Sequence, residues 1–171
     1  MKKKYKNSLG RNIWKFDCYY ANGQLKWQEI IPNLVVDEGL EHALEVIFLS
    51  GTPYADWYIE LFNSDSTPAD SWTYANIGTD QTPFEDYDEV TRPEWSPASV
   101  SNLSLTASVS FTASAGVNTT IYGAYVVNVS TKGDNVSAAG VMWCATKFAT
   151  PRVYVATEVL SVTYVINSQD V

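Results

Sequence analysis

The stretch Leu103-Ser-Leu-Thr-Ala-Ser-Val-Ser-Phe111 decides the fold class of this 171-residue chain. Serine and threonine alternate there with five apolar residues, Leu103, Leu105, Ala107, Val109 and Phe111. Because successive side chains on a strand point to opposite faces, one face of the segment is apolar and the other is covered with hydroxyl groups. The pattern predicts an antiparallel sheet with one solvated face.

Similar patterns fill the rest of the second half of the chain. They predict strands at about 100–112, 119–129, 138–148 and 152–166, with a turn at 132–135. An earlier strand is predicted at 56–62, and a long, turn-rich connection follows it at 63–99. A connection of this length is expected to be functional or to pack as an extended flap.

The N-terminal segment 12–31 predicts a β-hairpin. Asn22-Gly23 is the preferred pair for a two-residue type I′ turn, which would pair Tyr20 with Leu25 and Cys18 with Trp27. In that register both strands present apolar residues to the same face, which supports the assignment. The residues expected on this face are Trp14, Phe16, Cys18, Tyr20, Leu25 and Trp27.

One amphipathic helix is predicted after the hairpin. Asp37 is the expected N-cap, and Gly51 and Pro53 should end the helix. His42 is expected on a solvated face near three glutamates, with a proton carrier or a metal ligand as the alternative. The opposite face carries a stripe typical of a helix that packs on a core, formed by Leu40, Ala43, Leu44, Ile47 and Phe48.

The order of these elements indicates a mainly β protein. We expect an antiparallel β-sandwich or jelly-roll-like domain with an N-terminal hairpin and one helix. Residues 12–171 are expected to form this single domain, preceded by a basic N-terminal arm at 1–11.

Charge is distributed unevenly along the chain. The first fifteen residues carry +6 and the others carry −14, which leaves −8 overall. The arm is either a solubilising tail or a segment that docks on an acidic protein surface. Nucleic acid is not an expected partner, because a short arm offers few phosphate contacts. The candidate partner-binding residues of the arm are Lys2, Lys3, Lys4, Lys6 and Arg11.

No motif in the sequence predicts catalysis or a cofactor. GxSxG, HExxH, P-loop and GxGxxG patterns are all absent, so a non-enzymatic protein is expected. Cys18 and Cys144 are expected to be buried thiols, with a long-range disulfide or a reactive thiol as alternatives. No apolar run is long enough to cross a membrane, and no apolar stretch follows the basic start as in a secretory signal.

Two features of the long connection are candidates for partner binding. The acidic segment 85–89, with Glu85, Asp86 and Asp88, is a solvated loop, a calcium site or a surface for a basic partner. Trp72 and Trp95 are candidates for a partner or carbohydrate surface, the alternative being that the connection packs on its own domain.

The order of several short motifs resembles a family of small virion proteins of tailed bacteriophages. The resemblance covers about 12–166, and the sequence departs from the family pattern at Glu60, where the family usually has glycine, and in its Lys-rich start. The motifs are Gly23-Gln-Leu-Lys-Trp27, Asn33-Leu-Val-Val, Glu38-Gly-Leu40, Trp57-Tyr-Ile-Glu-Leu61, Tyr87-Asp-Glu-Val-Thr-Arg-Pro93 before Trp95, Ile121-Tyr-Gly-Ala-Tyr125 and Ser130-Thr-Lys-Gly133.

This resemblance implies a structural component of a phage particle, made in the cytoplasm of the bacterial host. We expect a capsid decoration or cement protein whose partners are the major capsid protein, other virion proteins and further copies of the chain. The arm and the segment 85–95 are the expected contacts, with Arg92 a candidate for a bidentate pair with a carboxylate. A neck, tail or fibre component and a carbohydrate-binding module for host attachment are the alternatives.

Overall fold

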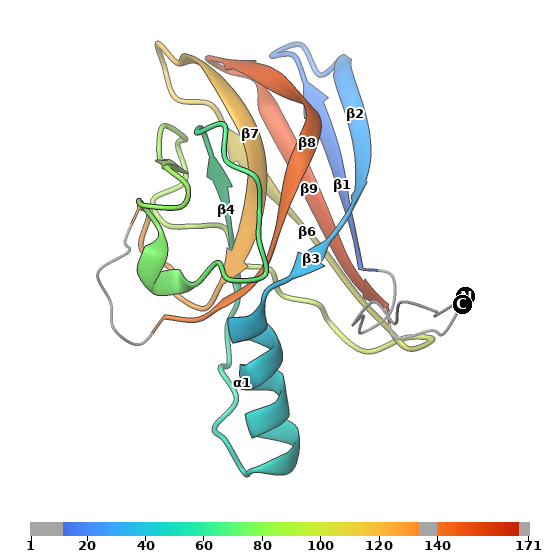
Figure 1. Cartoon of the computed structure of the whole chain (residues 1–171). Coiled ribbons are helices and arrows are strands. Elements are labelled where there is room, and N and C mark those ends of the chain that lie inside the picture. The colour runs from blue at the N-terminus through green and yellow to red at the C-terminus, as the bar shows by residue number, and fades with distance from the viewer. Residues whose placement is uncertain (1–11, 134–139, 168–171) are drawn as a thin grey trace, which may run out of the picture.

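The computed structural model describes residues 12–133 and 140–167, and these form a β-sandwich of two antiparallel sheets (Figure 1). The first sheet has the order β2-β1-β9-β6, with β1 at Ile13–Tyr19, β2 at Leu25–Pro32, β9 at Val159–Asn167 and β6 at Ser104–Thr112. The second has the order β3-β8-β7-β4-β5, with β3 at Leu34–Val35, β8 at Met142–Val155, β7 at Asn118–Val127, β4 at Tyr58–Phe62 and β5 at Pro83–Phe84. The predicted mainly β fold is confirmed.

The alternating stretch forms β6 and behaves as predicted over most of its length. Val109 and Phe111 are buried between the sheets, while Thr106, Ser108 and Ser110 are exposed on the other face. Leu103 was expected on the apolar face but lies before the strand, with a φ of 59° and 62% of its surface exposed. A leucine in the left-handed region belongs to a turn, so the strand begins at Ser104 and not at about residue 100 as predicted.

The N-terminal hairpin is confirmed, but its turn differs from the prediction. Cys18 pairs with Trp27 as expected, whereas Leu25 pairs with Tyr19 across a β-bulge. Gly23 has a φ of 80° and donates its amide to the Tyr20 carbonyl at 2.8 Å. Only one residue of the turn has a positive φ, so it is a type I turn with a glycine bulge rather than type I′. The bulge leaves Tyr20 and Leu25 exposed beyond the core face.

The last hairpin also differs from the prediction. The sequence suggested a break between strands at 149–151, but β8 continues through Pro151 and the chain turns at 156–158. The pairing of β7 with β8 jumps from Gly123 with Lys147 to Ile121 with Arg152. This irregularity leaves residues 148–151 without a paired register, and a proline is tolerated at such a bulge.

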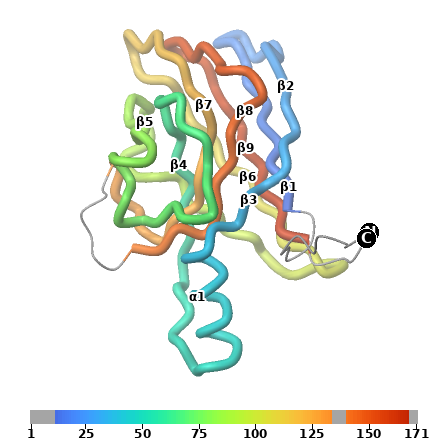
Figure 2. The backbone as a smooth tube through the Cα atoms, in the orientation of Figure 1, coloured from blue at the N-terminus to red at the C-terminus, as the bar shows by residue number. Residues whose placement is uncertain are grey.

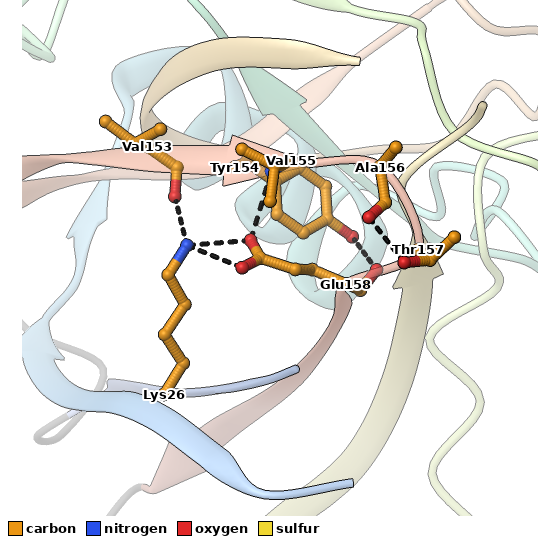
Figure 3. Close-up of polar contacts among 7 residues, drawn as sticks. All are labelled: Lys26, Val153, Tyr154, Val155, Ala156, Thr157 and Glu158. Atoms are coloured by element: carbon orange, nitrogen blue, oxygen red, sulfur yellow. Dashed lines mark hydrogen bonds and ion pairs between the residues drawn. The ribbon is translucent and has the colours of Figure 1, made fainter. Parts of the chain in front are cut away.

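An ion pair closes this turn onto the first sheet (Figure 3). Glu158 is 2% exposed, and its carboxylate lies 2.6 Å from the Lys26 ammonium of β2. Lys26 also donates to the Val153 carbonyl at 2.9 Å, and the Val155 amide donates to Glu158 at 3.0 Å. The pair therefore joins β2, β8 and the turn before β9.

Apolar residues form two cores. The main core lies between the sheets and contains Trp14, Phe16 and Cys18 of β1. The second lies on the outer face of β4, β7 and β8, where Phe62 and Tyr125 pack against Trp72 and Tyr74 from the long connection. Figure 2 shows this connection, including β5, running beside β4. The connection therefore packs as a flap with its own core, one of the two expected outcomes.

Both cysteines are buried and free, in agreement with the expectation of buried thiols. Cys18 lies on β1 of the first sheet and Cys144 on β8 of the second. Burial raises the pKa of the Cys18 thiol to about 12 and that of Cys144 well above its usual range.

Candidate interaction surface and pocket

The only α-helix among the described residues, α1 at Asp37–Phe48, projects away from the sandwich (Figure 1). Its first turn is fixed to the body by Glu38, whose carboxylate accepts the Tyr74 amide at 2.8 Å and the Met142 amide at 2.6 Å. Gly39 packs directly on β8, because a Cβ there would lie 2.4 Å from the Trp143 carbonyl oxygen. The predicted N-cap is wrong by one residue: Val36 holds that position, and Asp37 is the first residue of the helix.

The apolar stripe of this helix is exposed. The structure leaves 55% of Leu44, 64% of Ile47, 73% of Phe48 and 75% of the following Leu49 accessible to solvent. The expectation that this stripe packs on the core is therefore wrong for its C-terminal half, because the helix extends beyond the sheets and these side chains face solvent. We call these four residues the helix-tip patch.

The opposite side of α1 faces the body through His42. The ring of His42 lies 4.7 Å from the Tyr54 ring and 6.0 Å from the Trp57 ring, measured between centroids. The expectation of a solvated His42 is wrong, because the chain returns along the helix at 53–57 and half-buries the imidazole. The acids Glu41 and Glu45 stay exposed, and α1 contains no lysine or arginine. The helix-tip patch therefore has acidic neighbours.

A pocket of about 460 Å³ lies between the sandwich and the side of α1, along the helix from His42 to Ile47. Its walls come from this part of the helix, the returning segment 53–57, the segment 94–97 and the ends of β6, β7, β8 and β9. The aromatic residues that line it are His42, Tyr54, Trp57, Trp95 and Trp143. Aliphatic residues, including Val46, Leu105 and Ile166, complete the lining. The wall is thus largely apolar and rich in rings.

Two carboxylates, Asp56 and Glu94, also line the pocket, and both residues are exposed. They lie close enough to Tyr58 to act on its hydroxyl: burial raises the pKa of Tyr58, and the negative charges of Asp56 and Glu94 raise it further. Among the described residues that line the pocket, none is a lysine or an arginine. The charged side chains of this lining are therefore both negative.

Arg92, expected to bind a partner carboxylate, instead pairs inside the protein with Glu60. Both side chains are fully buried, and the Arg92 Nε donates to Glu60 Oε2 at 2.9 Å. An Nη atom also donates to the Val129 carbonyl at 2.8 Å. Burial raises the pKa of the Glu60 carboxyl to about 7, although the positive Arg92 opposes this rise. Arg92 was predicted to pair with the carboxylate of a partner, but its side chain is used in a buried pair within the chain, which serves the fold.

Four of the motifs noted in the sequence meet around this ion pair. Lys132 donates to the Tyr87 carbonyl at 2.5 Å and lies 3.8 Å above the Tyr87 ring centroid. The Arg92 amide donates to the Ser130 carbonyl at 2.8 Å. Gly123 sits at the β7 bulge, where a Cβ would lie 2.1 Å from the Thr146 carbonyl oxygen. Around the ion pair, these motifs therefore contribute to the core.

The other predicted site residues differ in whether they are buried, exposed or outside the described part of the chain. Trp72 and Trp95 are only 5% and 6% exposed, so neither offers a ring face on the surface, and the carbohydrate interpretation loses its basis. Glu85, Asp86 and Asp88 are exposed. Within residues 12–133 and 140–167, no three potential ligand side chains are grouped as a metal site requires. The candidates Lys2, Lys3, Lys4, Lys6 and Arg11 lie outside the described residues.

Sequence reasoning did not predict the pocket. Trp57 and Trp143 lie next to or on strands and pack against the main core, while both also line the cavity. Tyr54 was not singled out at all. The Pro53-Tyr54 pair after the helix marks where the chain turns back, but nothing in the sequence indicates that this segment faces Trp143.

Comparisons with known proteins found no matching family model, curated protein or solved structure. Among the residues that the structure describes, no helix has the length and apolar character needed to span a bilayer.

Proposed function

We propose that this protein is a non-enzymatic structural component of a tailed-phage virion, most simply a decoration or cement protein of the capsid. The observation that carries the proposal is the helix-tip patch. Contiguous exposed apolar side chains on a rigidly anchored element are typical of protein–protein contact sites. The resemblance of the ordered motifs to those of virion proteins is the reason for proposing a phage particle as the partner assembly.

The geometry suits docking on a larger assembly. The double hydrogen bond of Glu38 and the close approach of Gly39 fix the base of α1, so the tip is presented at a defined position. Complete burial of a side chain such as Ile47 or Phe48 contributes roughly 1.5–3 kcal/mol. A single patch of this size gives weak binding once the cost of association is subtracted. Many copies on one particle, or an oligomer, would raise the overall affinity through avidity.

The charges around the patch indicate the kind of partner surface. Glu41 and Glu45 are exposed beside it, so a second acidic helix would be repelled. An apolar groove with basic residues at its rim fits better. We propose that the helix tip docks into such a groove on a capsid protein. Homo-oligomerisation, if it occurs, should use another face.

The test uses particles purified without this protein, to which the full chain is added back. The variants Leu44→Ser and Phe48→Ser should reduce the bound copies per particle by about tenfold or more. Val90→Ser is the matched control, since Val90 is 92% exposed but lies on a distant loop. Equal binding of all three variants would refute docking through α1.

Copy number decides between the capsid and the alternative locations. Occupancy across the whole shell supports decoration, whereas a small ring at one vertex supports a neck component. Absence of the protein from purified particles would overturn the virion role itself.

A further inference from the structure

The pocket between α1 and the sandwich has the features of a site for an organic cation. Its aromatic residues form a continuous series of rings from the helix to β8. The centroids of Tyr54 and Trp57 are 6.1 Å apart, and those of Trp57 and Trp143 are 6.2 Å apart. His42 joins the same series at 4.7 Å from Tyr54. A group entering the pocket would therefore meet several rings at once.

Two of the three indole N–H groups of the wall are already used within the protein. Trp143 Nε1 donates to the Tyr164 hydroxyl at 2.9 Å, and Trp95 Nε1 donates to the Tyr164 carbonyl at 3.1 Å. These bonds hold the two indoles in place and remove their donors from the cavity. The pocket walls consequently offer ring and aliphatic surface more than hydrogen-bond donors, which disfavours a polyhydroxyl ligand such as a sugar.

The rings and carboxylates of the pocket favour a positively charged ligand. Aromatic faces carry negative potential and attract cations within about 6 Å of the ring centroid. Asp56 and Glu94 add two carboxylates to the lining, and no lysine or arginine there offsets them. The volume of about 460 Å³ lies at the small end of the range for ligand sites. A compact cation with an apolar surface matches each of these properties.

We propose that this pocket binds an alkylammonium group, such as a trimethylammonium head or the end of a lysine side chain, against the rings of Tyr54, Trp57 and Trp143. The carboxylates of Asp56 and Glu94 neutralise the cation from the lining. Ile47 belongs both to the pocket wall and to the helix-tip patch, but the other three residues of the patch do not line the pocket, so cation binding does not require the proposed docking of α1 on a particle.

The first experiment titrates the full-length protein with choline and with its neutral isostere 3,3-dimethyl-1-butanol, followed by calorimetry and tryptophan fluorescence. Choline should bind at least about tenfold more tightly than the alcohol, because only choline gains from the rings and carboxylates as a cation. Equal affinity of the two, or no saturable response to a cation up to about 100 mM, would overturn the proposal. Nα-acetyl-lysine amide distinguishes the source: tighter binding than choline indicates a protein side chain, and weaker binding indicates a small molecule.

The second experiment locates the site. Asp56→Asn and Glu94→Gln should each weaken choline binding about three- to tenfold and leave the alcohol unaffected. Asp88→Asn is the matched control, because Asp88 is exposed on another loop and does not line the pocket. Tyr54→Leu tests the ring contribution at a position that is 37% exposed, and it should weaken the binding of choline. Unchanged choline affinity in both carboxylate variants would refute the assignment to this pocket.

Discussion

Replacing Arg92 by methionine should be among the most destabilising single changes in this protein. Arg92 and Glu60 are both fully buried and lie 2.9 Å apart. Methionine fills much of the same volume but leaves the Glu60 carboxyl without its cation and the Val129 carbonyl without a donor. Above about pH 7, where Glu60 is ionised in the wild type, breaking this buried pair on one side costs about 3–5 kcal/mol, because the carboxyl left behind must either stay charged without its cation or take up a proton.

A double-mutant cycle separates this effect from lost packing. The double variant Glu60→Leu with Arg92→Met removes both charges, so it should recover most of the lost free energy of unfolding and approach the wild type. Urea denaturation at constant pH measures all four proteins. If the double variant is as unstable as Arg92→Met alone, the buried carboxylate is not the cause and the reasoning fails.

Arg152→Met is the matched control for this cycle. Arg152 also pairs with a glutamate, Glu29, at 2.8 Å, but the two side chains are 28% and 12% exposed. Solvent screens such a pair, so its loss should cost about 1 kcal/mol. A cost similar to that of Arg92→Met would show that burial does not govern the energetics of these pairs.

Two further predictions follow from the same structure. The stabilising contribution of protonated Glu60 should be fully present below about pH 4.5 and be lost as the pH rises to about 7, because the folded protein retains this proton to higher pH than the unfolded chain. Relative to Glu60→Gln, the wild type should therefore lose up to about 3 kcal/mol across this window in urea titrations, and parallel profiles would contradict the assignment. Gly39→Ala should cost about 1–3 kcal/mol and increase amide exchange in α1, because its Cβ would lie 2.4 Å from the Trp143 carbonyl oxygen. Gly116→Ala provides the contrasting case: its Cβ meets nothing within 4 Å but its φ is 85°, so any cost there reflects backbone strain and should leave α1 exchange unchanged.

Local patterns predicted the strands well because side-chain alternation depends only on neighbouring residues. The β6 stretch and the Cys18–Trp27 pair were both found in this way. The errors arose where backbone conformation or bulges decided the outcome. The positive φ of Leu103 and the irregular pairing near Pro151 depend on tertiary packing that no local pattern records.

The site was harder to predict because a sequence does not show which faces remain unpaired. The apolar stripe of α1 has the spacing of a core-facing helix, yet the tip around Phe48 has no partner within the described part of the chain. Arg92 and Trp95 looked available because they lie in a long connection, but that connection packs on the domain and buries both. The solvent exposure of a side chain depends on the whole fold. Its charge and its aromatic character, in contrast, follow directly from the sequence.

The position of β1 also determines when the protein can fold during synthesis. β1 pairs only with β2 and β9 in the first sheet, and Ile13 lies opposite Val165. The strand made first must therefore wait for the strand made last, a delay on the order of ten seconds at ribosomal elongation rates. During that interval the apolar face of Trp14 and Phe16 has only the hairpin to shield it, so chaperone contact or aggregation should concentrate on nascent chains that lack the C-terminal strand.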